Sequence, residues 1–447
     1  HASDHEIHTH EAFVRAVLLA GLTIVLLCPP APLAAQQRQV TLEEAIRLAR
    51  EKDPTVVQAT GAVRSANANV LQAKGSFLPN LSASAGRGTN FSEGPSRVDP
   101  VTGEVISGDI TNSSLQFGLS SGIEIFSGFR RSGQLRDANA TLRQQEANLD
   151  NQLAQSALRV SAQFFEVLAT TELIRAREAS VAREEEKLRI AEARLATRGT
   201  TISDSLQAVV SLAEARLNLL TQRSRLATAE ANLARVIGVD GRVGAVSDPS
   251  LFVLGPEPSA EALMAEALER SPVVLRSEAS VQAARARLTT AKAAYYPNVN
   301  LSASTNWSGS GRTDYELFGS RGISLGVSWN IFNRFGRETQ VTQQQVALES
   351  ALAEAEDSRR QVMAQLVAQL ANLSAARERI AVTELSVQAA RANVNVQLER
   401  YRLGTITITE LGLAQDALNR AEEQGVSARF EYLRAKAEIE ALIGRPL

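Results

Sequence analysis

One pentapeptide in the chain has the spacing of a hydrolytic nucleophile. Gly118 to Gly122 reads GLSSG and matches G-x-S-x-G, in which a serine at a sharp strand-to-helix turn attacks an acyl carbon with help from a histidine base. Here Ser120 lies within a segment of alternating apolar and polar residues rather than at such a turn. The four histidines all precede residue 11, so none follows that could act as the base. We therefore expect no catalytic residue and no enzyme activity.

The residue types that most often bind transition metals are confined to the start of the chain. These residues are His1, His5, His8, His10 and the single cysteine, Cys28. We interpret the histidine-rich segment as an extension that precedes a signal peptide rather than as a metal site. We also interpret Cys28 as part of the apolar core of that signal rather than as a lipid-attachment site, because Leu27 stands where such sites need a small residue. The sequence thus predicts neither a metal nor a cofactor.

Residues 1–35 are predicted to be this extension and signal peptide. Arg15 is followed by twelve apolar or neutral residues, from Ala16 to Leu27, and then by two prolines and small residues. Twelve helical residues span about 18 Å, which is too short for a hydrocarbon layer of about 30 Å. We expect cleavage after Ala35, and therefore export.

Composition and charge narrow the class further. The chain of 447 residues has only 4% aromatic residues, and its long runs are rich in Ala, Gln, Glu and Arg, which suits long helices better than a compact enzyme. Removing residues 1–35 changes 47 basic and 49 acidic residues to 46 of each. A neutral chain is not expected to bind nucleic acid. The acidic run Glu184, Glu185 and Glu186 is interpreted as the solvated face of a helix.

The mature chain consists of two copies of one pattern. At an offset of 218 residues, "FLPNLSAS" from Phe77 matches "YYPNVNLSAS" from Tyr295 at the shared Pro-Asn pair, and at an offset of 206 "IFSGFRRSGQ" from Ile125 matches "IFNRFGRETQ" from Ile331. Each copy is predicted to contain a helix, a strand, a variable loop, a second strand, a long helix, a turn and a further helix. We predict a first repeat over 36–238, a linker over 239–258 and a second repeat over 259–447.

The long helices carry the strongest local signal. Residues 134–198 and 337–403 contain no Gly or Pro over 65 and 67 residues, so each would be near 100 Å long. Apolar residues recur every seven positions, which is typical of coiled coils; they are Ile174, Val181, Leu188 and Leu195 in the first helix and Val387, Val394 and Tyr401 in the second. Glycines at Gly199 and Gly404 then predict turns into helical hairpins, with Ser203 and Thr409 as plausible helix caps.

Four segments alternate between apolar and polar residues, which is the period of a β-strand. The apolar positions are Leu81, Ala83 and Ala85; Leu115, Phe117, Leu119, Ile123 and Ile125; Val299, Leu301, Ala303 and Trp307; and Ile323, Leu325, Val327, Trp329 and Ile331. A soluble sheet with one buried face has the same pattern. Because no other helix is apolar enough to cover four strands, the chain is exported, and Trp307 and Trp329 suit a membrane interface, we favour transmembrane strands. Four strands cannot close into a barrel alone, so a dimer, trimer or tetramer must supply the rest.

These features together resemble the TolC-like outer-membrane efflux proteins over almost all of the mature chain. The duplicated half, its two helix-to-strand junctions, its two strand exits and "RYRLGTITITELGLAQ" from Arg400 carry the resemblance. It implies a mainly α-helical homotrimer, with a twelve-strand transmembrane β-barrel in the outer-membrane lipid and a long α-helical barrel in the periplasm. It also implies a periplasmic adaptor protein and an inner-membrane transporter as partners, with substrate passing through unchanged.

The resemblance further implies a gate at the periplasmic tip. In the family, an acidic residue after the first turn bonds to a tyrosine and an arginine near the second. Asp204 and Tyr401 match, but Ile406 stands at the arginine position, so part of this latch is missing or replaced, with Arg402 as a possible substitute. Glu410 matches the first of two acidic rings at the constriction. Leu413 replaces the second, which predicts a less cation-selective entrance.

Two alternatives remain open at this level. The same conduit can serve a type I protein secretion system rather than an efflux pump, since specificity should lie in the transporter. The chain could also be a water-soluble periplasmic adaptor or scaffold, which washing of membranes at high salt or high pH would release.

Overall fold

The computed structural model describes residues 38–106, 110–255, 259–311, 316–445 and 447. The predicted signal peptide, its cleavage site, the four histidines and Cys28 lie outside the described residues. In the first half the elements are β1 (Arg38–Val40), α2 (Leu42–Lys52), α3 (Pro54–Gly75), β2 (Asn80–Ser92), β3 (Arg97–Val98), β4 (Val105–Ile106), β5 (Ile110–Ser127), α4 (Arg130–Ala196) and α5 (Ile202–Ile237). In the second half they are β6 (Val243–Ala245), η1 (Pro249–Phe252), α6 (Ala260–Arg270), α7 (Pro272–Ala291), η2 (Lys292–Tyr295), β7 (Asn298–Gly311), β8 (Phe318–Ser328), α8 (Gly336–Arg402) and α9 (Ile408–Ile443).

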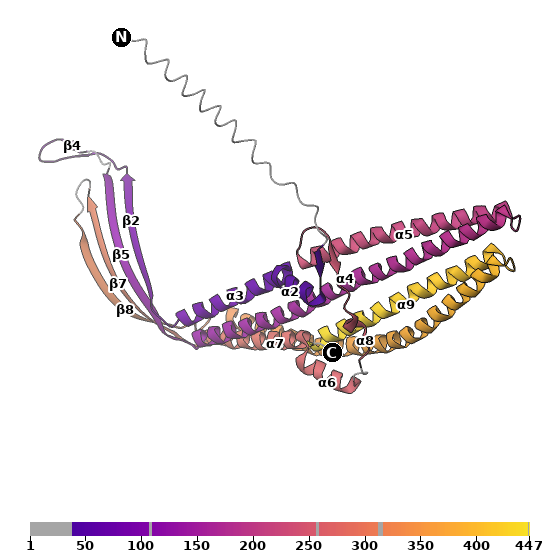
Figure 1. The fold of residues 1–447 in the computed structure, drawn as a ribbon. Helices are drawn as coiled ribbons and strands as arrows, with labels where there is room; N and C mark the ends of the chain where they lie inside the picture. Colours follow the sequence, from indigo (N-terminus) through magenta and orange to yellow (C-terminus); the bar gives the residue numbers. More distant parts are fainter. Residues whose placement is uncertain (1–37, 107–109, 256–258, 312–315, 446) are drawn as a thin grey trace, which may run out of the picture.

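The molecule is elongated, with a curved sheet at one end and two helical hairpins at the other (Figure 1). The hairpin α4–α5 belongs to the first repeat and α8–α9 to the second. Helices α4 and α8 each contain 67 residues and run from the sheet to the hairpin tips. In the part of the chain that the structure describes, no helix is long and apolar enough to cross a membrane.

The four long strands form one antiparallel sheet in the order β2-β5-β7-β8. Directly opposed residues share a face, and the register separates two kinds of row. One face carries rows such as Ala85–Phe117–Trp307–Gly319. The other carries serine and asparagine rows, in which the hydroxyls of Ser82 and Ser120 lie 2.7 Å apart, as do those of Ser302 and Ser324. The predicted alternation is therefore present as one apolar and one polar face.

Two details of the strand prediction were wrong at the end of the sheet nearest the helices. The register of β5 shifts between Glu124 and Phe126, so Ile125 is the extra residue of a bulge and Phe126 takes the place expected for it on the apolar face. Strand β8 ends at Ser328, so Trp329 and Ile331 follow the strand rather than belong to it.

Each long helix begins at an aromatic junction that is repeated in the two halves. Phe129 and Phe335 have left-handed backbones, with φ of 67° and 63°. Each packs edge to face on a phenylalanine three positions earlier, Phe126 or Phe332, with ring centres 5.5 Å apart in both cases. Helix α4 starts before the predicted residue 134 because Gly133 is tolerated within it. A side chain at Gly133 would collide with Thr290 of α7, so this glycine permits close helix packing.

The helices form a single row that is open at both edges. Beside the sheet the order of contacts is α3-α4-α7-α8, and toward the tips it is α5-α4-α9-α8. The main core lies midway along the molecule, where α4, α5, α8 and α9 contribute fully buried residues such as Phe164, Leu233, Leu366 and Ile439. Outside this core, packing is confined to narrow seams between neighbouring helices.

The predicted linker over 239–258 is partly ordered into regular structure. Its strand β6 pairs in parallel with β1, so that Val40 lies opposite Ala245. Its short helix η1 places Phe252 edge to face on Phe430 of α9. The connection between the repeats therefore packs against the helical core. Through β6 it also pairs with β1, which lies at the start of the described chain.

Candidate functional site

The two hairpin turns lie together at the end of the molecule farthest from the sheet (Figure 1). Gly404 has a left-handed backbone with φ of 81°, and the amide of Thr405 donates to the carbonyl of Arg400 at 2.9 Å. In the first hairpin the equivalent bond runs from the amide of Gly199 to the carbonyl of Arg194 at 2.7 Å. There the left-handed residue is Arg198, with φ of 59°, rather than the neighbouring glycine. Both glycines lie in hairpin turns as predicted. Gly404 is the left-handed residue of its turn, whereas Gly199 follows the left-handed residue of the other turn by one position.

The predicted helix caps were wrong by two positions. The side chain of Thr201 caps α5 by accepting from the amide of Asp204 at 3.3 Å, and Thr407 caps α9 by accepting from the amide of Glu410 at 3.3 Å. Ser203 and Thr409 lie inside the first turns instead. An acidic residue three positions after the cap favours the start of each helix, so Asp204 and Glu410 have the same local role in the two repeats.

Tyr401 is the centre of an apolar cluster at the tips. It lies in α8, is 1% exposed and packs with residues of the other three hairpin helices, namely Ile190 and Ala191 of α4, Ala208 of α5, and Ile408 and Leu411 of α9. The predicted heptad stripe that ends at Tyr401 is therefore a packed seam. The cluster holds the tips of the two hairpins together within one chain.

Arg194 of α4 bridges the two hairpins beside this cluster. Its guanidinium lies over the Tyr401 ring, 4.8 Å from the ring centre. It donates to the carbonyl of Tyr401 at 2.9 Å and to the carbonyl of Gly199 at 2.9 Å. One cation thus contacts the C-terminal end of α8 and the turn after α4, where free carbonyls favour positive charge.

The side chains of Asp204 and Tyr401 are close but are not hydrogen-bonded to each other. Asp204 accepts from the hydroxyl of Thr200, while the Tyr401 hydroxyl is buried without a hydrogen-bond partner among the described residues. Burial raises the pKa of the Tyr401 phenol; the charge of Arg194 opposes this effect and that of Asp204 adds to it. The phenol therefore stays neutral at physiological pH, and the contact with Arg194 involves the ring and the backbone.

Arg402, named above as a substitute for the latch arginine, pairs with two glutamates in the single chain. Its guanidinium bonds to Glu186 at 3.2 Å and to Glu399 at 3.0 Å. Ile406, at the expected arginine position, packs on the apolar cluster. Arg194 supplies the guanidinium at Tyr401 instead. The sequence offered one signal for it, because Arg194 is the repeat counterpart of Arg400, but nothing in the local sequence distinguishes the partly buried arginine from the exposed one.

Glu410 is exposed, and its carboxylate accepts from the backbone amide of Thr407 at 2.9 Å. It forms a capping box that fixes the first turn of α9. Leu413 is 63% exposed one turn further on. Both residues are therefore accessible near the tip.

The expectation of a solvated acidic run was wrong for Glu184. Glu184 is 7% exposed and pairs with Lys187, which is 2% exposed and donates to the Gln415 side chain of α9 at 3.1 Å. Glu185 is exposed and pairs with Arg216 at 2.8 Å. A polar seam therefore runs between α4 and α9 immediately above the apolar cluster.

This polar seam continues toward the sheet. Arg183 of α4 donates to Asn419 at 2.8 Å and pairs with Glu422 at 3.2 Å, and Arg391 of α8 also pairs with Glu422 at 3.2 Å. Further along, Arg177 pairs with Glu423 and Arg434 with Glu166. We refer to these α4–α9 contacts, from Glu166 to Lys187, as the polar seam.

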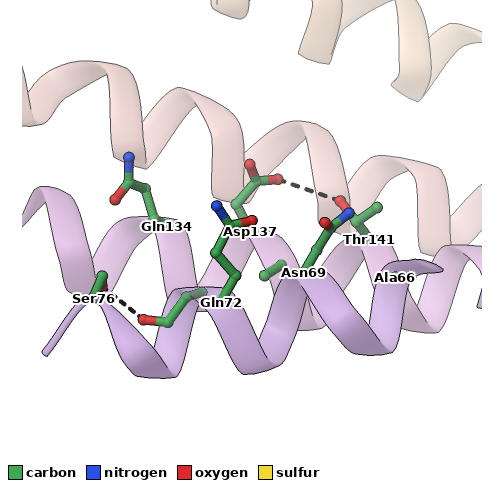
Figure 2. Close-up of a pocket in the computed structure, with 9 residues that line it drawn as sticks. Ala66, Asn69, Gln72, Ser76, Gln134, Asp137 and Thr141 are labelled. Carbon is green, nitrogen blue, oxygen red and sulfur yellow. Dashed lines mark hydrogen bonds between the residues drawn. The ribbon is translucent and has the colours of Figure 1, made fainter. Parts of the chain in front are cut away.

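A separate groove of about 360 Å³ lies between α3 and α4, near the sheet. Figure 2 shows amide and hydroxyl side chains facing each other across it, among them Asn69 and Gln72 of α3 and Gln134 of α4. Asp137 on its rim pairs with Arg287 at 3.4 Å. The polar side chains that line this groove are amides, hydroxyls and one carboxylate, which is paired with an arginine. They do not form an acid–base pair. Among the described residues, no group of three or more His, Cys, Asp or Glu side chains could hold a metal ion.

The apolar face of the sheet is accessible in the single chain. Its exposed residues include Leu81 (73%), Ile323 (81%), Leu325 (64%) and Val327 (69%). Trp307 lies on this face within β7. Trp329 lies just past β8, at the end of the sheet nearest the helices, and its indole N–H donates to the carbonyl of Tyr295 at 3.2 Å. The two tryptophans thus mark opposite ends of the apolar face.

Comparison with known proteins accounts for this architecture. The family model described as "Outer membrane efflux protein" matches residues 45–239 and 263–445. The chain belongs to the outer membrane efflux protein family. It is 25% identical to the outer membrane efflux protein BepC of Brucella suis biovar 1 (strain 1330), over 96% of this chain and 91% of that protein. It is also 25% identical to the outer membrane protein TolC of Escherichia coli (strain K12), over 51% of this chain and 48% of that protein.

Solved structures of this kind share the fold. The CmeC outer membrane channel of Campylobacter jejuni superposes with a TM-score of 0.76 at 15% identity, covering 90% of this chain and 85% of that one. The outer-membrane channel OprN gives 0.73 at 18% identity, covering 90% and 89%. These structures show the fold, and membership of the outer membrane efflux protein family favours an outer-membrane protein over the soluble scaffold.

Proposed function

We propose that three copies of this chain close edge to edge into one exit duct of a tripartite efflux pump. The three sheets would form a twelve-strand barrel in the outer membrane, and the hairpins a helical conduit in the periplasm. A periplasmic adaptor and an inner-membrane transporter would deliver substrate to the tips. The observation that carries this proposal is that sheet and helical row are both unclosed at both edges.

The edge helices support closure by further copies of the same chain. On α5, exposed apolar residues follow heptad spacing, with Val210 (50%) and Leu217 (62%) seven positions apart and Leu206 (60%) and Leu220 (60%) fourteen apart. On α8, Val382 (67%) and Val396 (56%), together with Leu403 (77%) at the C-cap of the helix, follow the same spacing. We call these the α5 stripe and the α8 stripe. Since each lies on an edge of one row, α5 of one copy can form a coiled coil with α8 of the next.

The proposed gate is at the hairpin tips. In the resting state, Arg194, Tyr401 and Asp204 would hold the two hairpins of each chain together and keep the entrance narrow. Adaptor binding would favour a state in which one hairpin moves relative to the other. Three copies of the exposed Glu410 would favour cations at the entrance. Substrate would pass without chemical change.

Single-channel conductance in a planar bilayer tests both duct and gate. The purified wild type should give small, cation-preferring steps, and Asp204→Ala should give larger ones. Glu410→Ala should reduce the preference for cations while leaving open-channel size unchanged. A folded protein that inserted into the bilayer but gave no steps would contradict the duct, whereas steps unaffected by Asp204→Ala would contradict the role of Asp204 alone.

A further inference from the structure

A cation lies among apolar residues on the lipid-facing side of the sheet. Arg321 of β8 pairs with Thr305 of β7 and so lies in the row Ala83–Leu119–Thr305–Arg321. Its side chain is exposed, and it forms no ion pair with any residue that the structure describes. Neighbouring rows on this face contain Leu81, Ile323, Phe117 and Trp307. An arginine on the lipid-facing side of a membrane strand is unfavourable unless its charge finds water or an anion.

Arg321 also lines a groove on this face. The groove has a volume of about 690 Å³ and includes Leu81, Leu119, Ala303, Trp307 and Ile323 from all four strands. The register places Trp307 opposite Gly319, two residues from Arg321 on the same strand, so the indole and the guanidinium are diagonal neighbours. The groove thus combines an apolar floor, an amphipathic ring and one guanidinium. That combination fits an amphiphile with apolar chains and an anionic head.

The position of Arg321 along β8 agrees with the depth at which lipid headgroups are expected. Val327 lies near the helices, and Gly319 lies eight positions away on the same strand. At ~3.3 Å per residue, this separation is about 26 Å along the strand. A strand tilted by about 40° covers roughly 20 Å of membrane thickness over that length, close to the height of the apolar band of a membrane barrel. The Trp307 row therefore marks the boundary farthest from the helices. Arg321 lies one row inside it, within reach of that boundary for a long side chain that extends toward the headgroups.

We propose that Arg321 and Trp307 form a binding site for the phosphate of a phosphorylated glycolipid in the outer leaflet. The guanidinium would bind the phosphate through two parallel hydrogen bonds, and the groove would hold the acyl chains. Arg87 lies on the same face, on the opposite edge strand β2, one row farther from the helices than Trp307 and two rows farther than Arg321. Edge-to-edge closure brings β2 of one copy beside β8 of another, so the two arginines would line one seam. This inference rests on the proposed channel assembly and its orientation.

Native mass spectrometry of the full chain in detergent, with added diphosphoryl lipid A as the probe, tests the site. Wild type should retain the lipid, and Arg321→Gln should retain about five- to ten-fold less, as expected for loss of a charge-assisted bidentate contact. Arg321→Lys should be intermediate, because it keeps the charge but not the paired geometry. Arg360→Gln, which removes an exposed arginine of α8, is the matched control and should bind as wild type does.

Two outcomes would overturn the site. One is equal retention by wild type and Arg321→Gln, and the other is equal retention by wild type of lipid A and of its dephosphorylated form. Far-ultraviolet circular dichroism checks that each variant is folded. Conductance in bilayers without lipid A separates this result from the proposed function, since Arg321→Gln should conduct as wild type does. Absence of conductance in wild type itself would contradict the duct rather than the lipid site.

Discussion

Arg194 contacts both hairpins of the chain at the point where they meet. Its two backbone contacts, at 2.9 Å each, join the end of α8 to the turn after α4, and its planar guanidinium covers the buried Tyr401 ring. A lysine at this position could supply the positive charge. It could not stack a planar group on the Tyr401 ring and at the same time donate to both carbonyls in the geometry of a guanidinium. The repeat counterpart, Arg400, is exposed, and among the described residues its guanidinium hydrogen-bonds only to Gln397, at 3.5 Å. The two arginines are therefore a natural pair of test and control positions.

We expect Arg194→Ala to open the entrance. The substitution removes the contacts between hairpins, so single-channel conductance should rise several-fold, whereas Arg400→Ala should leave it unchanged. Tyr401→Phe should behave as wild type, because the lost hydroxyl has no hydrogen-bond partner among the described residues. A rise with Tyr401→Phe and none with Arg194→Ala would show that the phenol holds the tips together instead.

Asp53 forms a polar node where α2 and α3 meet α4. Its side chain is 7% exposed, caps α3 through the amide of Thr55 at 2.9 Å, accepts from the Ser156 hydroxyl at 2.6 Å and pairs with Arg159 at 2.7 Å. The counterpart in the second repeat, Ser271, is fully buried with a hydroxyl that has no partner among the described residues. The buried polar group at this junction is thus hydrogen-bonded in the first repeat, whereas in the second repeat it has no partner among the described residues.

These two positions should respond in opposite ways to removal of the polar group. Asp53→Ala should lower the free energy of unfolding by about 2 to 3 kcal/mol, because it removes a helix cap and leaves Ser156 and Arg159 without their acceptor. Ser271→Ala should be neutral or slightly stabilising, since it removes a buried hydroxyl that lacks a partner. Urea denaturation followed by circular dichroism measures both. Equal losses would contradict the assignment of the node.

The stabilisation by Asp53 should depend on pH in the acid range. Burial alone would raise the pKa of Asp53, but hydrogen bonds from Ser156, Arg159 and Thr55 outweigh it and hold the pKa well below the usual range. The folded state therefore favours the carboxylate, and its contribution is fully present above about pH 4 and is lost as the pH falls further. The stability difference between wild type and Asp53→Asn, measured by urea denaturation, should shrink below that pH. A difference that grew on acidification would contradict this sign.

At the scale of elements, the seam between α4 and α9 is unusual because its packing is polar as well as apolar. Lys187 and Glu184 are buried together, and Gln415 bonds to the lysine from the facing helix. A buried ion pair adds little net stability over an apolar pair, but either charge alone is unfavourable there. Such a seam favours one pair of facing surfaces on α4 and α9, because a shifted packing would leave these polar groups buried without partners.

A double-mutant cycle measures this coupling. Lys187→Met should lower the free energy of unfolding by about 3 kcal/mol, because Glu184 is left buried without its cation. Glu184→Gln combined with Lys187→Met should recover most of that loss. Arg216→Met, which breaks the exposed pair with Glu185, serves as the control and should cost less than about 1 kcal/mol. If the single and double variants lost the same stability, the pair would not be coupled.

At the scale of the whole molecule, the sheet and the row of helices of one chain both have unpaired edges. Its sheet ends at β2 and β8, its helical row near the tips ends at α5 and α8, and both edge helices carry exposed heptad stripes. Buried apolar area between chains would complete both layers at once. The subunit contact is therefore expected to extend along the full length of the molecule.

A charge on an edge stripe should prevent assembly. Leu217→Glu places a carboxylate in the α5 stripe, so we expect native mass spectrometry to show mainly monomer, whereas wild type should show the proposed trimer. Val101→Glu is the control, because Val101 is 90% exposed in the loop between β3 and β4, away from both edges, and should assemble normally. Normal assembly of Leu217→Glu would mean that the α5 stripe is not a subunit contact.

The order of helices and strands and the membership of the family could be predicted from the residues alone. Strand alternation and heptad spacing depend only on residues a few positions apart, so the two long hairpins and the two faces of the sheet could be predicted. Tertiary structure alone decided which side chains meet. Arg194 bonds to Tyr401 across 207 residues, and Lys187 bonds to Gln415 across 228. The burial of Glu184 and the bulge at Ile125 likewise depend on a facing helix or strand. A local pattern specifies which face of a helix is polar, but only the neighbour packed against it decides whether that face is solvated or buried.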